Sequence, residues 1–167
     1  MGSFYYRGKR DMRRKDREIK DLNKVKEIIA ASHCCRLGFR DGERVYIVPM
    51  NFGFTEEEGK LVFYFHSARE GHKLDLIREN GVAGFELDTN YQLIKADIAC
   101  EYTARFQSVI GSGKIEIIEE EQEKRKGLLE VMKQSTGRTD WEFPDQMVNA
   151  VTVFKLTVSE YACKEHE

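Results

Sequence analysis

The alternation of apolar and polar residues predicts a chain built mainly of β-strands. Apolar residues alternate with others from Cys35 to Phe39, and Asp41-Gly42 is a typical hairpin turn. The dense apolar run of residues 61–65 suits a strand that is buried on both faces. Seven strands are expected in total, over residues 35–39, 44–54, 61–65, 82–87, 100–109, 114–118 and 151–158. Because antiparallel strands leave exposed sheet edges, the economical arrangement is a closed or nearly closed barrel.

Three helices are expected to flank this sheet. The first begins after Asp21, which can cap its exposed amides, and presents apolar residues on one face. A short second helix should stop at Asn80-Gly81. A charged third helix spans roughly residues 119–134. The predicted fold class is therefore α+β with a dominant antiparallel sheet.

Length and composition suit one domain. The chain has 167 residues, of which 41% are hydrophobic and 34% are charged. Residues 1–18 are highly charged and are expected to form a solvated arm before a single domain of residues 19–167. The net charge of -2 gives no general attraction to nucleic acid or to anionic membranes. No stretch approaches the roughly 20 apolar residues that span a bilayer, and the charged start differs from a secretory signal. We therefore expect a cytoplasmic location, with no nucleic-acid or membrane partner.

The cysteines show no repeated metal-ligand spacing. We interpret Cys34, Cys35, Cys100 and Cys163 as buried thiols, without a disulfide framework or a metal site. A redox role for Cys34 or Cys35 stays open beside this interpretation.

Pro49 lies inside an otherwise convincing strand. Proline has no amide hydrogen for a sheet ladder, so we expect the ladder to be interrupted there. Such an interruption leaves backbone groups free to meet a planar ligand with polar edges, and Asn51 can donate and accept beside them. An edge strand or bulge without a ligand is the alternative.

The segment from His66 to Lys73 joins a buried strand to the start of a short helix. Arg69, His72 and Lys73 place cations at the positive end of the helix dipole, which is unfavourable without a counter-charge. A bound phosphate would resolve this conflict through the free helix amides, the Ser67 hydroxyl and the cations. A solvated basic turn is the alternative.

A third segment, residues 105–113, is a weaker signal. Strand alternation puts Ser108 and Val109 on opposite faces, and the glycines of Gly111-Ser112-Gly113 allow another backbone to approach closely. The same three residues are also typical of a tight turn. Trp141 can cover a flat ring, although aromatic residues in such regions are more often part of a core or an interface.

Several segments together resemble the pyridoxamine 5'-phosphate oxidase-like superfamily, and more closely its nitroimidazole-resistance-type flavoproteins. The resemblance runs in order from Met12 over nearly the whole chain. It is carried by four segments: MRRKDREI from Met12, VPMNFGF from Val48, YFHSAREGHKLDLIREN from Tyr64, and SVIGSGK from Ser108.

The resemblance implies a split barrel of six to seven antiparallel strands that binds FMN between two identical subunits. Backbone groups of Val48, Pro49, Met50, Asn51 and Phe52 would line the flavin ring. By the same resemblance, Ser67, Ala68 and Lys73 would hold the phosphate, with Ser108 and Val109 contributing from a neighbouring strand or the partner chain. Two departures from the family pattern, Phe106-Gln107 and Gly111-Ser112-Gly113, bear on the contacts to the ring edge.

The function that follows is an FMN-dependent reductase of a small acceptor, with nitroaromatic compounds as the example that the family suggests. The flavin carries such chemistry itself, and reduced nicotinamide is a candidate electron donor. Because His66 directly precedes the expected phosphate loop, we predict that it faces the substrate side of the flavin as an acid–base group. Trp141 is expected to be an accessory to the cofactor site.

Two alternatives remain. One is pyridoxamine 5'-phosphate oxidase activity, although the tail after Val151 lacks the basic, arginine-containing motif of that enzyme. The other is a flavin-binding protein without turnover, or a haem-binding protein in which His66 or His72 meets the iron.

Overall fold

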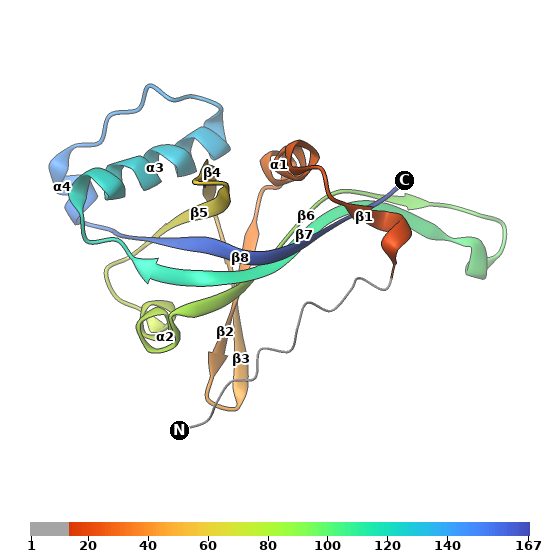
Figure 1. Ribbon diagram of the computed structural model, residues 1–167, viewed down its shortest axis with the longest axis horizontal. Coiled ribbons are helices and arrows are strands. Elements are labelled where there is room, and N and C mark those ends of the chain that lie inside the picture. Colours follow the sequence, from red (N-terminus) through yellow and green to blue (C-terminus); the bar gives the residue numbers. More distant parts are fainter. Residues whose placement is uncertain (1–13) are drawn as a thin grey trace.

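Eight strands form one antiparallel sheet in the computed structural model, which describes residues 14–167 (Figure 1). The strands are β1 (Glu18–Ile19), β2 (Cys35–Asp41), β3 (Arg44–Met50), β4 (Gly53–Glu57), β5 (Lys60–Ser67), β6 (Val82–Ile94), β7 (Thr103–Ile117) and β8 (Thr152–His166). The helical elements are η1 (Lys15–Arg17), α1 (Leu22–Ala31), α2 (His72–Asn80), η2 (Ala99–Glu101), α3 (Glu121–Thr136) and α4 (Asp145–Asn149). The predicted fold class is confirmed, with one strand more than expected.

The order of the strands explains how the sheet curls. Hydrogen bonds place them in the order β3-β2-β6-β7-β8-β5-β4, with β1 beside β8. β3 and β4 therefore lie at opposite edges of the sheet, although only Asn51 and Phe52 separate them along the chain. Three peptide steps span at most about 11 Å, so the two edges must approach each other here. The sheet is a split barrel that stays open between β3 and β4, and the expected closure is incomplete.

The strands predicted over residues 100–109 and 114–118 are one strand, β7. The glycines in Gly111-Ser112-Gly113 do not make a turn. A Cβ atom on Gly113 would lie 2.2 Å from the carbonyl oxygen of Thr157, and one on Gly111 would lie 2.4 Å from that of Glu160. The glycines thus allow β8 to pack closely, and β8 continues to His166, beyond its predicted end at residue 158.

The predicted interruption at Pro49 falls two residues later. Pro49 is paired with Arg36 inside β3, and the ladder ends at Met50. Since β3 is the outermost strand at its edge of the sheet, a missing amide hydrogen is tolerated there. The single strand expected over residues 44–54 is therefore two strands on opposite edges.

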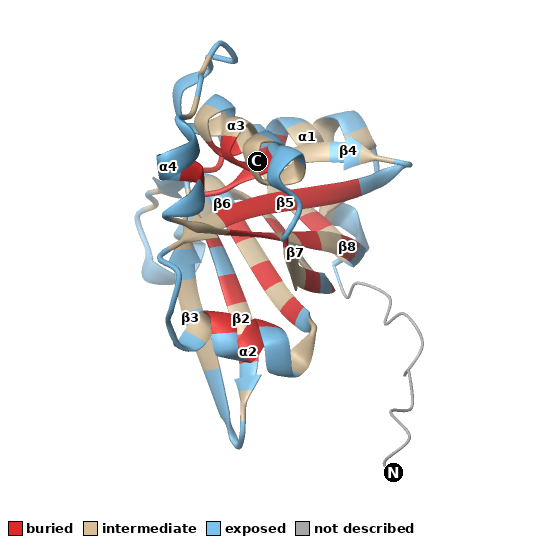
Figure 2. Cartoon of the chain, turned by 90° about the vertical axis from the view of Figure 1, so that its left-hand side faces the viewer, coloured by how far each residue is buried: buried red, intermediate tan, exposed pale blue. Residues whose placement is uncertain are grey.

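The core has two parts, and β5 separates them. Side chains on one face of β5, such as Phe63 and Phe65, join α1, α2 and the concave face of the sheet in the larger cluster. Those on the other face, Val62 and Tyr64, pack beneath α3. Figure 2 shows the buried residues as bands across the strands. The prediction that this strand is buried on both faces is confirmed.

The helix signals are largely confirmed. The Asp21 side chain accepts a hydrogen bond from the amide of Asn23 at the start of α1, and α2 ends at Gly81 in the left-handed conformation. The boundary expected at residue 18 falls within β1, which pairs with β8, and residues 1–13 of the predicted arm lie outside the described residues. None of the helices described over residues 14–167 is long and apolar enough to cross a membrane.

Candidate functional site

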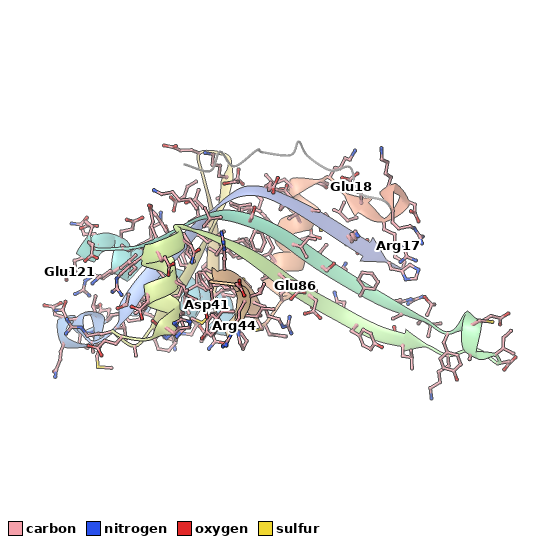
Figure 3. All side chains as sticks on the ribbon, turned by 90° about the horizontal axis from the view of Figure 1, so that it is seen from below. Arg17, Glu18, Asp41, Arg44, Glu86 and Glu121 are labelled. Carbon is pink, nitrogen blue, oxygen red and sulfur yellow. The ribbon has the colours of Figure 1, made fainter. Side chains whose placement is uncertain are left out.

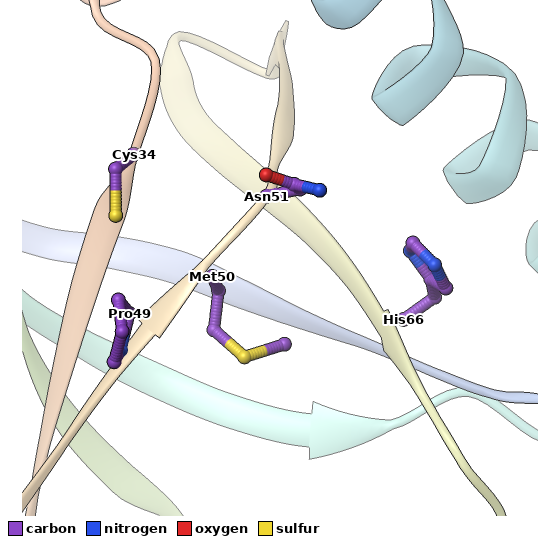
Figure 4. A pocket seen from close by; sticks show the side chains of 5 residues that line it. All are labelled: Cys34, Pro49, Met50, Asn51 and His66. Atoms are coloured by element: carbon purple, nitrogen blue, oxygen red, sulfur yellow. The ribbon is translucent and has the colours of Figure 1, made fainter.

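A hollow of about 290 Å³ lies where the two edges of the sheet approach each other (Figure 4). It is lined by Cys34, Pro49, Met50, Asn51 and His66. We call it the edge hollow. The structure therefore brings four of the predicted site residues together with one cysteine. In Figure 4 the Met50 side chain extends toward the side of His66, whereas Pro49 lies on the side of Cys34.

The residues after Met50 are held firmly behind this hollow. Phe52 is 1% exposed and packs against Phe63, with the ring centroids 5.8 Å apart. Gly53 follows, and a Cβ atom there would lie 2.2 Å from the backbone carbon of Glu130 in α3. With Phe52 buried and Gly53 against the helix, Asn51 between β3 and β4 is exposed. Phe52 belongs to the core, so it can meet a ligand only through its backbone, and the half-buried Val48 packs against the same core.

His66 is the most unusual polar group of the hollow. It lies near the end of β5, opposite Val153 of β8, and is partly buried. Its Nδ1 atom is shielded from solvent and has no hydrogen-bond partner in the part of the chain that the structure describes. Burial lowers the pKa of His66 below its ordinary value, which favours the neutral imidazole. A neutral imidazole offers one donor and one acceptor, and the unpaired Nδ1 suits a bound molecule.

The expected phosphate loop, residues 67–73, follows His66 directly. The Ser67 hydroxyl donates to the carbonyl of Ala68 at 2.9 Å, and Gly71 adopts a φ of 146°, which favours glycine. No side chain within residues 14–167 caps the start of α2. Lys73 is half-buried, and its ammonium has no ion pair with any residue that the structure describes. An uncapped helix start beside an unpaired cation suits an anion.

His72 does not join this group of cations as expected. Its Nε2 atom lies 2.9 Å from Oδ2 of Asp41. Its ring also meets the Tyr46 ring edge to face, with the centroids 5.1 Å apart. His72 is therefore engaged with the β2–β3 hairpin.

The remaining predicted residues do not line the edge hollow within one chain. Val109 is fully buried in the core, and Ser108 lies on the opposite face of β7, as the alternation predicted. Trp141 lines a second hollow of about 410 Å³ with Arg125, Lys126, Leu129, Glu142 and Phe143. The guanidinium of Arg138 lies 4.2 Å from the centre of the Trp141 ring. A role for Ser108 or Trp141 beside the edge hollow would need a second chain.

Cys34 is the lining residue that sequence reasoning missed. The structure places it before β2 and only partly buried, whereas the prediction was a buried thiol. The signal was available, because alternation puts the neighbour of the fully buried Cys35 on another side. Cys163 is buried as expected, and Cys100 is exposed, contrary to expectation. No group of three or more metal-binding side chains occurs within residues 14–167.

Comparison with known proteins places this site in context. The family model for pyridoxamine 5'-phosphate oxidase matches residues 21–165. A candidate 5-nitroimidazole antibiotic resistance protein from Bacteroides thetaiotaomicron has 30% sequence identity and a TM-score of 0.76, and the match covers 89% of this chain and 86% of that one. No match is found among curated proteins.

Two further structures share the fold at lower identity. The flavocytochrome Anf3 from Azotobacter vinelandii is 21% identical with a TM-score of 0.76, covering 94% of this chain and 72% of its own. An FAD- and haem-binding protein from Mycobacterium smegmatis is 16% identical with a TM-score of 0.78, covering 90% and 74%. The resemblance seen in the sequence motifs is confirmed by the family match and by the Bacteroides protein. The chain belongs to the pyridoxamine 5'-phosphate oxidase family.

Proposed function

We propose that this protein is an FMN-dependent oxidoreductase whose flavin ring lies at the edge hollow and whose phosphate site is the loop of residues 67–73. The observation that carries the proposal is the unpaired, buried Nδ1 of His66 in the edge hollow, together with the uncapped helix start that follows His66 closely in the chain. Two fold neighbours support it, because one is a flavocytochrome and the other binds FAD and haem.

The residues present fit the cofactor. Backbone groups of residues 48–52 would line the ring, and Ser67, Ala68 and Lys73 would hold the phosphate. The Ser67 hydroxyl, which donates to the Ala68 carbonyl here, would donate to a phosphate oxygen instead, and Lys73 would supply the counter-charge. When bound, the flavin supplies the hydride or electron transfer.

His66 provides the acid–base group of the site. Its neutral imidazole can accept a proton at one nitrogen or donate one from the other, depending on the tautomer. Because His66 is partly buried, one side of its imidazole ring is shielded from water. This chain thus orients the cofactor and moves a proton at His66, while the acceptor lies on the open side of the hollow.

The size of the hollow favours a dimer. Ligand pockets usually have volumes of about 300–1,000 Å³, so a hollow of about 290 Å³ leaves much of an FMN molecule uncovered. A second chain would cover the rest. Ser108 lies on the same outer face of the sheet as Ile47 and Ile110, which are 64% and 49% exposed. We assign this face to a homodimer interface, at which the partner chain brings its own β7 to the flavin.

The acceptor proposed is a small nitroaromatic compound, by analogy with the Bacteroides relative, and the donor is a reduced nicotinamide. The test begins with the purified protein and added FMN. We expect flavin absorbance in the bound fraction, and oxidation of reduced nicotinamide only when a nitroaromatic acceptor is present. His66→Gln should retain FMN and lose turnover by about 10²-fold, a usual size for one acid–base group.

The phosphate site has its own test. Lys73→Glu should weaken FMN by roughly 1.5–3 kcal/mol, because a charge-assisted contact is lost, and should leave riboflavin nearly unchanged. Equal losses for both ligands would show that the loop does not hold the phosphate.

Haem is the second candidate, because an unpaired histidine nitrogen in a hollow also suits iron. His66 is the better candidate ligand, since Nε2 of His72 is bonded to Asp41. A Soret band after haem addition, lost in His66→Ala, would favour this function over the flavin.

A further inference from the structure

Helix α2 is attached to the β2–β3 hairpin at both of its ends. At its first residue, Nε2 of His72 lies 2.9 Å from Oδ2 of Asp41. At its last residue, Nδ2 of Asn80 donates to the Arg40 carbonyl at 3.0 Å and to the Leu76 carbonyl at 2.9 Å. Two neighbouring hairpin residues thus hold the two ends of one short helix.

The Asp41–His72 contact is not needed to keep α2 on the sheet. Leu74, Leu76 and Ile77 are at most 3% exposed and already bury the apolar face of the helix. By contrast, the side chains of Asp41 and His72 are 34% and 51% exposed, and pairs this exposed add little to stability. What the pair does restrain is the first turn of α2, which follows the permissive Gly71.

The same hairpin leads to the ring side of the proposed cofactor site. Tyr46 of β3 packs edge-on against His72, and β3 continues from there to Pro49 and Met50 in the edge hollow. One hairpin therefore contacts both the start of α2 and the hollow. The spacing between the edge hollow and the proposed phosphate loop depends on how the hairpin holds the first turn of α2.

We infer that Asp41 and His72 are positioning residues for the cofactor phosphate. They hold the uncapped amides of α2 and the ammonium of Lys73 at the spacing that one FMN molecule needs. The inference rests on the proposed function, and it assigns to His72 a role through Asp41 in place of direct contact with the phosphate.

The sign of one substitution separates this role from simple electrostatics. Asp41→Asn removes a negative charge near the proposed phosphate site, so charge alone predicts tighter FMN binding. Positioning predicts the opposite, because the imidazole loses its charged partner. We expect Asp41→Asn and His72→Gln each to weaken FMN by about fivefold to tenfold, because a neutral amide at either position bonds its partner less strongly than the carboxylate–imidazole contact does, with riboflavin unchanged.

The experiment measures FMN and riboflavin affinities by fluorescence quenching for the wild type, both single variants and the double variant. The double variant should lose no more FMN affinity than either single one, because the two residues act as one unit. Asp75→Asn is the matched control. This substitution removes a carboxylate from the first turn of the same helix. Among the described residues, the only ion pair of Asp75 is an exposed contact with Arg78 at 3.3 Å. Asp75→Asn should leave FMN affinity unchanged or slightly raised.

The inference is overturned if Asp41→Asn binds FMN as tightly as the wild type or more tightly. Additive losses in the double variant, or equal losses for riboflavin, would overturn it as well. If the wild-type protein binds FMN no more tightly than riboflavin, it has no phosphate site. That result would contradict the proposed function and not the positioning role alone. Unfolding midpoints of all variants identify any variant that fails through loss of folding, in which case the remaining single variant and the control decide.

Discussion

At the scale of single residues, burial sets the chemistry of His66. The imidazole loses hydration near the end of β5, and its Nδ1 has no compensating partner among residues 14–167. Burial therefore lowers its pKa and keeps the ring neutral in the folded protein. The same desolvation that supports the proposed proton transfer at His66 also costs stability under acidic conditions.

The pH dependence of unfolding tests this cost. In the unfolded chain His66 takes up a proton near its ordinary pKa of about 6.5, whereas the folded chain resists protonation until lower pH. Between these two values the unfolded state binds more protons, so stability rises with pH and is lost on acidification through the unfolded value of about 6.5. Urea unfolding of the flavin-free protein should show a smaller acid loss for His66→Gln than for the wild type. Equal losses in both proteins would show that His66 is not desolvated.

The four cysteines occupy different environments, so the reactivity of Cys34 can be compared with that of the others to report on the edge hollow. Cys34 lines the hollow, Cys100 is exposed, and Cys35 and Cys163 are buried. Burial raises the pKa of Cys35, and that of Cys163 to about 11, so both are poor nucleophiles at neutral pH.

Thiol labelling can therefore locate the flavin. A maleimide should modify Cys34 and Cys100 in the flavin-free protein, and saturating FMN should slow the labelling of Cys34 by about tenfold or more through exclusion of the reagent. Peptide mass spectrometry measures both sites in one sample, with Cys100 as the internal control. If Cys34 reacts at the same rate with and without FMN, the ring does not occupy this hollow.

At the scale of elements, periodicity and turn chemistry predicted the helices and most strands correctly. The Asp21 cap and the Gly81 end of α2 needed only local chemistry. The errors arose where tertiary contacts decide. Gly111 and Gly113 suit a turn by local propensity, yet their missing side chains serve the close approach of β8. Similarly, the pairing partner of each strand decides where the chain after Pro49 changes edge, and no local pattern specifies that partner.

The site was predictable to the same extent. Residues 49–51 lie at the proline inside a predicted strand, and His66 directly precedes the expected phosphate loop. The structure places all four residues around the edge hollow. The engagement of His72 by Asp41 joins residues 31 positions apart, so the local excess of cations gave no sign of it. In the sequence only the aromatic ring singles out Trp141, and its position depends on the packing of the α3–α4 connection.

The close contact between β4 and α3 gives a prediction at this scale. A Cβ atom on Gly53 would lie 2.2–2.4 Å from backbone atoms of Glu130 and Val131, which cannot rotate away. Gly53→Ala should therefore destabilise the fold by about 1–3 kcal/mol or more, as overpacking usually does. Gly38→Ala is the control, because no described atom lies within 4 Å of its added methyl group, and it should change stability by about 0.5 kcal/mol or less. Chemical denaturation measures both, and similar effects would mean that α3 can move.

At the scale of the whole molecule, the outer face of the sheet has the properties of an interface. Ile47 is paired with Gly38, which is paired in turn with Gly84, so the surface beside this isoleucine is flat. The charges on the same face compensate each other, since Arg36 bonds Glu86 at 2.8 Å and Asp88 at 2.6 Å. Two copies could therefore approach without strong repulsion. Figure 3 shows β6 and β7 running out together beyond the body of the molecule.

If the flavin lies between two chains, assembly and cofactor binding must be linked. A ligand that binds only the dimer stabilises it, by about 2.7 kcal/mol per site at a hundred times its dissociation constant. FMN should therefore shift the protein from monomer to dimer in light scattering at low protein concentration. The outer face of the sheet is the part of the molecule on which this linkage depends.

A charge placed on the outer face should weaken both dimer formation and FMN binding. Ile47→Lys and Ile110→Lys put a cation where an apolar contact would be buried, at a cost that a weak interface does not offset. We expect monomers at micromolar concentration and at least a tenfold loss of FMN affinity, because each chain alone covers only part of the cofactor. Met147→Lys is the matched control. Met147 is 61% exposed and belongs to α4, not to the strands of the outer face, so this variant should change neither dimer formation nor FMN affinity. A monomeric Ile47→Lys protein that binds FMN as tightly as the wild type would place the whole cofactor site within one chain. It would then leave Ser108 without a role at the cofactor, because this residue does not line the edge hollow of its own chain.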